Sequence, residues 1–209
     1  MCSSDLPDKI MSFGIPFDPK FNEPLNKFKI TQKFKLSQNL PTILIMGGGQ
    51  GLGPIKTIFR ALEKVHLQIQ EIVVTGTNKK LYNSLKRKIK KYKKKILLFG
   101  YVNNINELMT ISDIIITKPG GVTCAEVLTK HLAMLIVKPL PGQEANNTHY
   151  LTEKEAAIKL DEPKGINLII EDLLKDQDKL NRLCESASRL SKPNASLDIA
   201  RLLLDLFNA

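Results

Sequence analysis

Five short apolar runs separated by helical patterns constrain this sequence more than any other feature. They are rich in β-branched residues, are apolar at consecutive positions, and cover residues 43–46, 72–75, 96–99, 114–117 and 134–137. Such runs are typical of strands covered on both faces, which is how parallel βαβ sheets bury their strands. Between the first two runs, an apolar stripe from Ile55 to Val65 predicts a helix, with Pro54 suited to its first turn. The pattern predicts a doubly wound α/β domain with a parallel sheet.

The segments before and after this alternation have a different character. Residues 1–40 hold four prolines within their first 24 positions, which predicts an extended connector followed by a short helix near 25–36. After Leu160 the pattern becomes helical, and helices are expected at residues 166–175, 177–190 and 196–207. We therefore expect an interdomain linker and short helix at 1–40 and one ligand-binding domain at 41–209.

The positive charge of the chain is concentrated in one stretch. The sequence has 31 Lys and Arg against 21 Asp and Glu, and residues 79–95 contain ten of the basic residues and no acidic one. The rest of the chain therefore balances at 21 against 21. Apolar residues recur at four-residue spacing from Leu81 to Ile89, which predicts that most of 79–95 is one amphipathic helix with a basic exposed face. Such a face is either only solvated or attracted to an anionic membrane surface. With only Tyr82 and Tyr92 available for stacking, we expect no nucleic-acid partner.

Several classes of protein are excluded by what the sequence lacks. The longest apolar run without glycine has six residues, from Leu132 to Val137, whereas a transmembrane helix needs about 20. The first residues lack the basic and apolar regions of a secretory signal, so we expect a cytoplasmic protein. Cys2, Cys124 and Cys184 match no metal-ligand spacing, so we expect free thiols and no metal site.

A glycine-rich segment lies where the first strand is expected to turn into the first helix. Residues 46–53 read Met-Gly-Gly-Gly-Gln-Gly-Leu-Gly, and these glycines permit a tight turn and a close approach of another group to the backbone. The spacing is not the Gly-x-Gly-x-x-Gly of dinucleotide sites, and no Gly-Lys-Ser/Thr follows as in a P-loop. The segment either faces a ligand or has only a packing role.

A second glycine-rich turn, at residues 118–122, follows the fourth expected strand and opens a helix. Backbone N–H groups and the helix dipole at such a start attract a diphosphate. Thr123 can add a hydroxyl donor, and Glu126, one turn further along the same face, can accept hydrogen bonds from a ribose diol. The alternative is that Thr123 and Glu126 only cap the helix.

A rigid polar turn follows the fifth expected strand. Residues 139–147 read Pro-Leu-Pro-Gly-Gln-Glu-Ala-Asn-Asn, which places an amide and a carboxylate side by side at the carboxyl edge of the sheet, where open α/β sheets bind ligands. Paired donors and acceptors of this kind suit sugar hydroxyls. A polar loop leading into a helix capped by Gln or Asn is the alternative.

Together, these motifs resemble one known family. The relevant segments are Gly-Gly-Gly-Gln-Gly-x-Gly-Pro at 47–54, Gly-Tyr-Val followed by Asn104, Thr-Lys-Pro-Gly-Gly-Val-Thr-x-x-Glu at 117–126, and Pro-Gly-Gln-Glu at 141–144. They are similar to the donor half of the diacylglycerol glycosyltransferases of glycosyltransferase family 28, which include monogalactosyldiacylglycerol synthase and processive diacylglycerol glucosyltransferase. The resemblance runs from about residue 13 to the C-terminus, and residues 14–21 look like the segment that joins the family's two domains.

The resemblance implies a GT-B enzyme in which a Rossmann-like C-terminal domain, a parallel sheet flanked by helices with further helices at its end, binds a UDP-hexose donor. It implies transfer of the hexose to diacylglycerol with inversion, no required metal or other cofactor, and a peripheral membrane location. The acceptor lipid and the general base belong to the family's N-terminal domain. We expect that domain to be absent from this chain, so we expect no catalytic residue here and no activity from the isolated chain.

The resemblance also assigns the donor contacts. Tyr101 and Val102 would hold the uracil, and Glu126 would hold the ribose. The diphosphate would meet Thr123 and the amides around Gly121, and it would face the first glycine-rich loop across the cleft. The hexose hydroxyls would meet the amide and carboxylate of the polar turn. The full predicted donor site is Gly49, Gln50, Gly51, Tyr101, Val102, Gly120, Gly121, Val122, Thr123, Glu126, Gln143 and Glu144.

One departure from the family pattern and two alternatives remain. Residues 130–133 read Lys-His-Leu-Ala where the family usually has Gly-Leu-Pro, so His131 would take a left-handed backbone conformation at the helix end. In the same fold, a transferase of N-acetylglucosamine from its UDP derivative to an undecaprenyl-linked peptidoglycan precursor is an alternative, although Pro-Gly-Gly-x-Thr and Pro-Gly-Gln-Glu favour the glycerolipid branch. A non-catalytic UDP-sugar-binding subunit, completed by a separate acceptor-domain chain, is the other.

Overall fold

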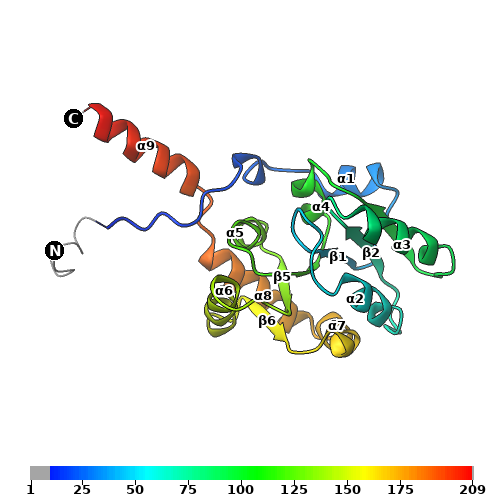
Figure 1. Cartoon of the computed structure of the whole chain (residues 1–209). Helices are drawn as coiled ribbons and strands as arrows, with labels where there is room; N and C mark the ends of the chain where they lie inside the picture. The colour runs from blue at the N-terminus through cyan, green and yellow to red at the C-terminus, as the bar shows by residue number, and fades with distance from the viewer. Residues whose placement is uncertain (1–9, 209) are drawn as a thin grey trace.

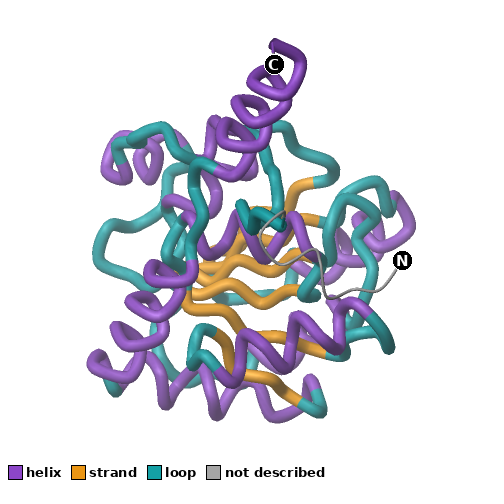
Figure 2. Tube along the Cα trace, turned by 90° about the vertical axis from the view of Figure 1, so that its left-hand side faces the viewer, coloured by secondary structure: helices purple, strands orange, loops and turns teal. Residues whose placement is uncertain are grey.

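Six parallel strands form the centre of the molecule in the computed structural model, which describes residues 10–208 (Figures 1 and 2). The strands are β1 Thr42–Met46, β2 Gln70–Val74, β3 Lys95–Phe99, β4 Ile114–Thr117, β5 Ala133–Val137 and β6 Ala157–Leu160. Their order in the sheet is β3-β2-β1-β4-β5-β6, and every neighbouring pair is parallel. The predicted α/β class with a parallel sheet is confirmed.

Helices cover both faces of this sheet (Figure 1). One layer contains α2 Ile55–Leu62, α3 Lys79–Ile89 and α7 Ile166–Lys175. The other contains the short helix η3 Pro19–Phe21 with α1 Lys27–Lys33, α4 Ile105–Thr110, α5 Gly121–Thr129 and α6 Gln143–Glu153. The short helix η4 Pro163–Gly165 precedes α7, and α8 Gln177–Leu190 contributes to both layers. The last helix, α9 Ala195–Asn208, projects away from the body.

The core consists of two apolar clusters, one on each face of the sheet. Successive side chains of a strand point to opposite faces, so Ile43 and Ile45 of β1 join one cluster whereas Leu44 and Met46 join the other. Every residue of β1, β2, β4 and β5 is buried. This two-sided burial is the reason why these runs are apolar at consecutive positions.

Strand β3 departs from this rule. It forms one edge of the sheet, and its residues are only half-buried, with Lys95 exposed. The expectation that 96–99 would be covered on both faces is met only in part, because Ile96 and Leu98 pack against one cluster and Leu97 and Phe99 against the other, but all four stay half-buried. Its sequence resembles that of a central strand because the pattern reports apolar side chains, whereas sheet order decides how completely they are covered.

Several helices agree closely with the predictions, and three elements besides the short helices η3 and η4 were not predicted. Residues 166–175 and 177–190 form α7 and α8, and α9 covers the expected 196–207. The sequence pattern did not reveal β6, α4 or, as a definite element, α6. Strand β6 has only four residues, Ala-Ile-Lys-Leu, of which Lys159 is exposed, so it carries too short an apolar run to be recognised.

Most of the basic segment is one amphipathic helix, as predicted, since α3 covers residues 79–89 and buries Leu81 and Leu85. Helix α3 ends at Ile89, and Lys95 already belongs to β3. Two tertiary contacts hold the connection. The ring of Tyr92 stacks on Phe59 of α2, with 4.4 Å between centroids, and Lys94 Nζ donates to the carbonyl oxygens of Leu62 and Val65 at 2.6 and 2.7 Å. Lys94 is thus turned inward onto the end of α2.

The region around His131 follows the prediction made for it. His131 has a φ of 51°, and the N–H of Leu132 donates to the carbonyl oxygen of Val127 at 3.2 Å, which closes the end of α5. The segment before β1 packs onto the domain through buried Phe17 and Phe21. Its role as an interdomain linker stays a prediction, and the expectations for Cys2 and the first residues fall outside the described part.

Within residues 10–208, no helix is long and apolar enough to cross a membrane. Over the same range, no group of three or more His, Cys, Asp or Glu side chains is arranged to hold a metal ion. Cys124 and Cys184 are free thiols. Cys124 packs as a small apolar side chain in one of the core clusters, and this burial raises the pKa of its thiol to about 12.

Candidate functional site

The strand order places the first and second glycine-rich turns next to each other. From β1 the chain winds outward to β2 and β3, and from β4 it winds in the opposite direction to β5 and β6. Strands β1 and β4 are hydrogen-bonded neighbours, with Ile45 opposite Ile116. The crevice at the carboxyl ends of two such strands is where doubly wound folds bind ligands. The turn after β1 and the turn after β4 meet at this crevice.

The first glycine-rich loop divides into packed and open positions. A Cβ on Gly47 would lie 1.9 Å from the carbonyl oxygen of Leu52, and one on Gly51 would lie 1.9 Å from that of Thr75. Gly51 also has a φ of 59°. Gly47 and Gly51 therefore have the packing role that was the alternative to facing a ligand. By contrast, a Cβ on Gly48 or Gly49 would meet nothing within 4 Å. The backbone of this loop is therefore open on one side, and that side lines the crevice.

The second glycine-rich turn presents unbonded backbone N–H groups. Gly120 is the N-cap of α5 and makes no side-chain capping bond, and none of the hydrogen bonds found within residues 10–208 uses the N–H of Gly121, Val122 or Thr123. The first bond of the helix runs from Cys124 N to Gly120 O at 2.8 Å. The capping alternative for Thr123 and Glu126 is wrong, since neither side chain closes the helix start. Unfilled donors and the helix dipole together favour an anion here.

Glu126 lies one turn further into α5 and faces a pocket of about 300 Å³. The pocket is lined by Met46, Gly48, Gly49, Val74, Gly76, Tyr101, Val102, Ile105, Val122, Thr123 and Glu126. Burial raises the pKa of the Glu126 carboxyl to about 7, with Lys20 acting in the opposite direction and Asp18 adding to the rise. Glu126 therefore changes charge close to neutral pH.

Tyr101 and Val102 stand on the opposite wall of this pocket, in the turn after β3. The Tyr101 ring is 65% exposed, whereas Val102 packs partly against the core. An exposed ring beside an apolar wall provides a stacking surface for a planar base. The structure thus brings Tyr101, Val102, Thr123 and Glu126 to one pocket, as the predicted donor site requires.

A smaller pocket of about 190 Å³ adjoins the first and shares Gly48, Gly49 and Thr123 with it. Its lining also includes Gly47, Gln50, Leu52, Lys118, Gly120 and Glu144. The Glu144 carboxylate accepts from Lys118 Nζ at 3.0 Å and from the N–H of Leu140 at 2.8 Å. These contacts hold Glu144 against the cleft wall.

Three predicted site residues, Gly51, Gly121 and Gln143, line neither of these pockets. Gly51 packs against the end of β2, as described above, and lines neither pocket. Gln143 is exposed at the start of α6 and also lines neither pocket, although its Nε2 lies 3.5 Å from the position that a Cβ on Gly121 would take. The predicted contacts with a donor, including those of Gly51, Gly121 and Gln143, remain predictions.

Two cations at the site were not among the predicted residues. Lys118 lines the smaller pocket, and its place in the Thr-Lys-Pro-Gly-Gly motif was a signal that could have revealed it. Lys20 belongs to η3 in the expected linker and forms an ion pair with Asp18 at 2.8 Å. The Lys20 pKa is raised, first by Asp18 and to a lesser degree by Glu126 and Tyr101. No local pattern marks Lys20, because its proximity to Glu126 arises only from folding.

Comparison with known proteins provides the family. The model of the glycosyltransferase family 28 C-terminal domain matches residues 42–203. The chain belongs to this family. The matched range contains both glycine-rich turns and the polar turn after β5, so the resemblance inferred from these motifs is confirmed.

Curated relatives carry diacylglycerol glycosyltransferase names. The processive diacylglycerol beta-glucosyltransferase of Bacillus subtilis is 35% identical over 191 residues, covering 91% of this chain and 50% of that protein. The probable chloroplastic monogalactosyldiacylglycerol synthase of Nicotiana tabacum is 32% identical over 209 residues, covering 96% of this chain and 39% of that protein. The chain thus spans about half the length, or less, of these relatives.

Solved structures agree on the fold. MurG of Acinetobacter baumannii matches with a TM-score of 0.70 at 19% identity, over 88% of this chain and 55% of that one. WaaG, a glycosyltransferase of lipopolysaccharide biosynthesis, matches with a TM-score of 0.69 at 17% identity, over 90% and 54%. HepE of Anabaena in complex with UDP-glucose matches with a TM-score of 0.63 at 16% identity, over 90% and 56%. The predicted Rossmann-like, GT-B type domain is confirmed.

Proposed function

We propose that this chain binds a UDP-hexose in the crevice between β1 and β4 and supplies the donor half of an enzyme that transfers the hexose to diacylglycerol. The observation that carries the proposal is the start of α5. The N–H groups of Val122 and Thr123 are unbonded, and these two residues line the same pocket as the Glu126 carboxyl one turn later. This spacing suits a diphosphate followed by a ribose.

The proposed binding mode follows from the two adjoining pockets. The uridine occupies the larger pocket, with the base against Tyr101 and Val102 and the ribose hydroxyls on Glu126. The diphosphate lies where the pockets meet, between the α5 amides and the open backbone of Gly48 and Gly49. The hexose enters the smaller pocket, where Glu144 is already held by Lys118.

In this proposal the transfer inverts the sugar and needs no resident metal ion. The positive potential for the diphosphate comes from the α5 N-terminus and the nearby Lys118 side chain. The acceptor site and the general base are assigned to a separate acceptor-binding half, so the isolated chain is proposed to bind donor without transferring sugar. The enzyme is proposed to work in the cytoplasm at a membrane surface, where diacylglycerol resides.

The names of the curated relatives favour diacylglycerol over the peptidoglycan precursor as acceptor. The MurG match, at 19% identity, supports the fold alone. A non-catalytic binding subunit makes the same donor contacts, and only an activity measurement separates it from the enzyme.

The first experiment is a calorimetric titration of the chain with UDP and UDP-glucose, with a nicotinamide dinucleotide as control. We expect weak binding of both uridine ligands and none of the dinucleotide, and binding of the dinucleotide alone would overturn the donor-site assignment. The second is a donor screen on this chain combined with an acceptor-binding half, using diacylglycerol and mass analysis of the lipids. Binding of UDP-hexose without transfer to any acceptor lipid would favour the subunit.

A further inference from the structure

The edge of the molecule formed by α3, the following turn and the start of β3 carries an unusual density of unpaired positive charge. We define the basic edge as nine residues: Lys79, Lys80, Lys86, Arg87, Lys88, Lys90, Lys91, Lys93 and Lys95. None of them takes part in an ion pair with any residue in 10–208, whereas lysines elsewhere, such as Lys27, Lys33 and Lys118, do. All except the half-buried Lys88 are exposed.

The tenth basic residue of the segment has a different role. Lys94 Nζ is bonded to two carbonyl oxygens at the end of α2, and burial lowers its pKa while Glu71 acts in the opposite direction. Lys94 is therefore a structural residue. A substitution meant to probe the surface has to leave it in place.

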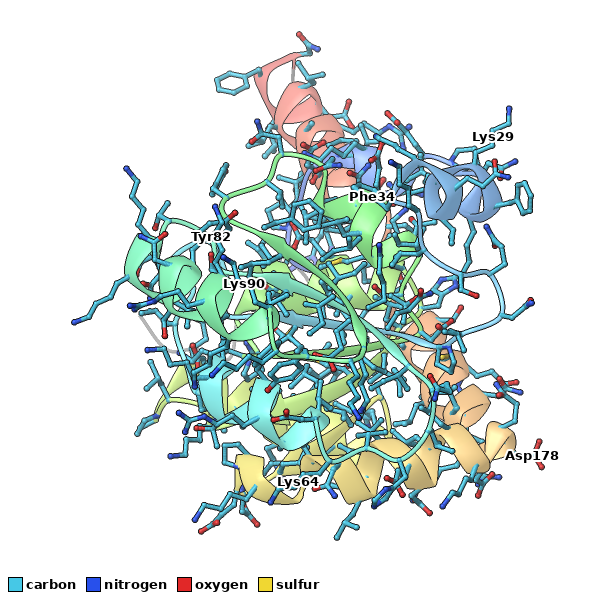
Figure 3. The ribbon with its side chains drawn as sticks, turned by 90° about the vertical axis from the view of Figure 1, so that its right-hand side faces the viewer. Lys29, Phe34, Lys64, Tyr82, Lys90 and Asp178 are labelled. Carbon is cyan, nitrogen blue, oxygen red and sulfur yellow. The ribbon has the colours of Figure 1, made fainter. Side chains whose placement is uncertain are left out.

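The basic edge is a rigid platform. Leu81 and Leu85 anchor α3 in the core, the Asn78 side chain accepts from the N–H of Leu81 at 2.9 Å, and the stacked Tyr92 ring holds the turn after the helix. Like charges four residues apart, such as Lys86 and Lys90, repel each other on this platform. Figure 3 shows Tyr82 and Lys90 on this side of the molecule. A bound anionic surface would relieve the repulsion.

The side chains around the basic edge indicate which kind of anionic partner it fits. Tyr92 is stacked on Phe59, Tyr82 is half-buried, and no large apolar side chain between residues 79 and 100 is among the exposed ones. Nucleic-acid binding without sequence preference relies on several free aromatic rings for stacking of successive bases, whereas the exposed ring beside this surface is that of Tyr101, which shares a pocket with Lys79 at one end of α3. The cations from residue 86 to residue 95 have no exposed aromatic or large apolar side chain among them, and such an array matches the headgroup layer of an anionic bilayer.

We infer that the basic edge docks the protein electrostatically on a membrane containing anionic lipids. The inference rests on the proposed function, because diacylglycerol is reached only at a membrane. The uridine pocket opens at the carboxyl ends of the strands, whereas residues 86–93 lie toward the other end of α3. Docking and donor binding therefore involve different residues and can be measured separately.

The test is a vesicle sedimentation assay with two matched variants. In the first, Lys86, Arg87, Lys90, Lys91 and Lys93 are replaced with Gln. The control replaces five other exposed cations that form no ion pair in the described structure and lie outside the basic edge: Lys29, Lys56, Lys64, Lys164 and Arg182. Figure 3 shows Lys29 and Lys64 well apart from Lys90. Both variants lose the same charge, so only the position of that charge differs.

The wild type is expected to bind vesicles of phosphatidylcholine with phosphatidylglycerol and not vesicles of phosphatidylcholine alone. The first variant should bind the anionic vesicles at least about tenfold more weakly, and the control variant should bind within about threefold of the wild type. High salt should mimic the first variant, because attraction decays over roughly 8 Å at physiological ionic strength.

Equal binding to neutral and anionic vesicles would overturn the inference, as would equal losses in both variants. Tighter binding of a single-stranded oligonucleotide than of anionic vesicles at the same salt would assign the surface to nucleic acid instead. Titration with UDP-glucose is run on the same samples. A wild type that binds UDP-glucose but no anionic vesicles, even at low salt, refutes only the docking surface, whereas a wild type that binds no UDP-glucose refutes the proposed function.

Discussion

Two glutamates of this domain share a raised pKa but lie in very different surroundings. Glu71, in β2 on the α2 and α3 side of the sheet, is fully buried, and neither of its carboxylate oxygens has a hydrogen-bond partner. Glu126 in α5 lies half-buried on a pocket at the carboxyl edge of the sheet. Burial raises the pKa of each carboxyl to about 7. A shifted pKa alone therefore does not identify a functional residue.

The two carboxyl groups differ in whether a ligand in a pocket can reach them. Lys94 lowers the pKa of Glu71 and Glu63 raises it. Glu71 lines neither of the two pockets in the crevice. Glu126 faces a pocket that also contains an exposed aromatic ring and the unbonded start of a helix. The carboxyl of Glu71 can only affect stability, whereas that of Glu126 can also recognise a ligand.

The largest expected effect is the loss of donor binding in Glu126→Ala. We expect UDP affinity to fall by about 1 to 3 kcal/mol, the range for hydrogen bonds to a charged group. Glu71→Met, which removes the other buried carboxyl, should leave UDP affinity unchanged. Calorimetric titration of both variants makes the comparison. A loss of thermal stability without loss of affinity in Glu126→Ala would remove Glu126 from the site.

A smaller effect is expected on stability from Glu71→Met. The folded pKa of Glu71, about 7, lies above its ordinary value of 4.5, so the folded state retains a proton that the unfolded state loses. The stability that this proton provides is present below pH 4.5 and is lost as the pH rises through 7. The variant should therefore be more stable than the wild type by about 1 to 2 kcal/mol at pH 8, with a much smaller gain at pH 5. Urea unfolding at the two pH values measures the difference, and a gain that does not depend on pH would contradict this assignment.

The pH dependence of donor binding should be milder. Ionised Glu126 is the better acceptor for ribose hydroxyls, and its pKa is about 7, so affinity for UDP-glucose should rise several-fold, about threefold to tenfold, between pH 6 and pH 8. The pH profile is measured with UDP-glucose and not with UDP, because the terminal phosphate of UDP itself titrates near pH 6. Glu126→Gln should bind weakly with a flat profile. A wild-type profile that is equally flat would show that the charge of Glu126 does not matter for binding.

The smallest effect concerns Lys20. Its charge lowers the pKa of Glu126, so Lys20→Met should shift the midpoint of the UDP-glucose pH profile upward by less than about one unit. Lys33→Met is the matched control, because Lys33 pairs with Glu107 at 2.7 Å. A downward shift, or the same shift in both variants, would rule out a direct influence of Lys20 on the site.

The sequence by itself determined the strands of the sheet interior, several helices and the three turns that carry the motifs. Residues 166–175 and 177–190 were predicted to the residue, because periodicity along a helix depends only on near neighbours in the chain. The motifs in the turns were also sufficient to identify the family. The left-handed backbone of His131 followed from comparison with the family pattern, which usually has glycine there.

Tertiary structure decided which strands and which side chains are neighbours in space. It made β3 an edge strand, added β6, and ended α3 at Ile89 by turning Lys94 onto the end of α2. It also brought Lys20 from the expected linker to Glu126, more than 100 positions away in the chain. The physical reason is that burial and electrostatic interactions depend on distances in space. Neighbouring residues along the chain specify helices and turns, but only the packed sheet order specifies which charges and which open backbone groups share one crevice.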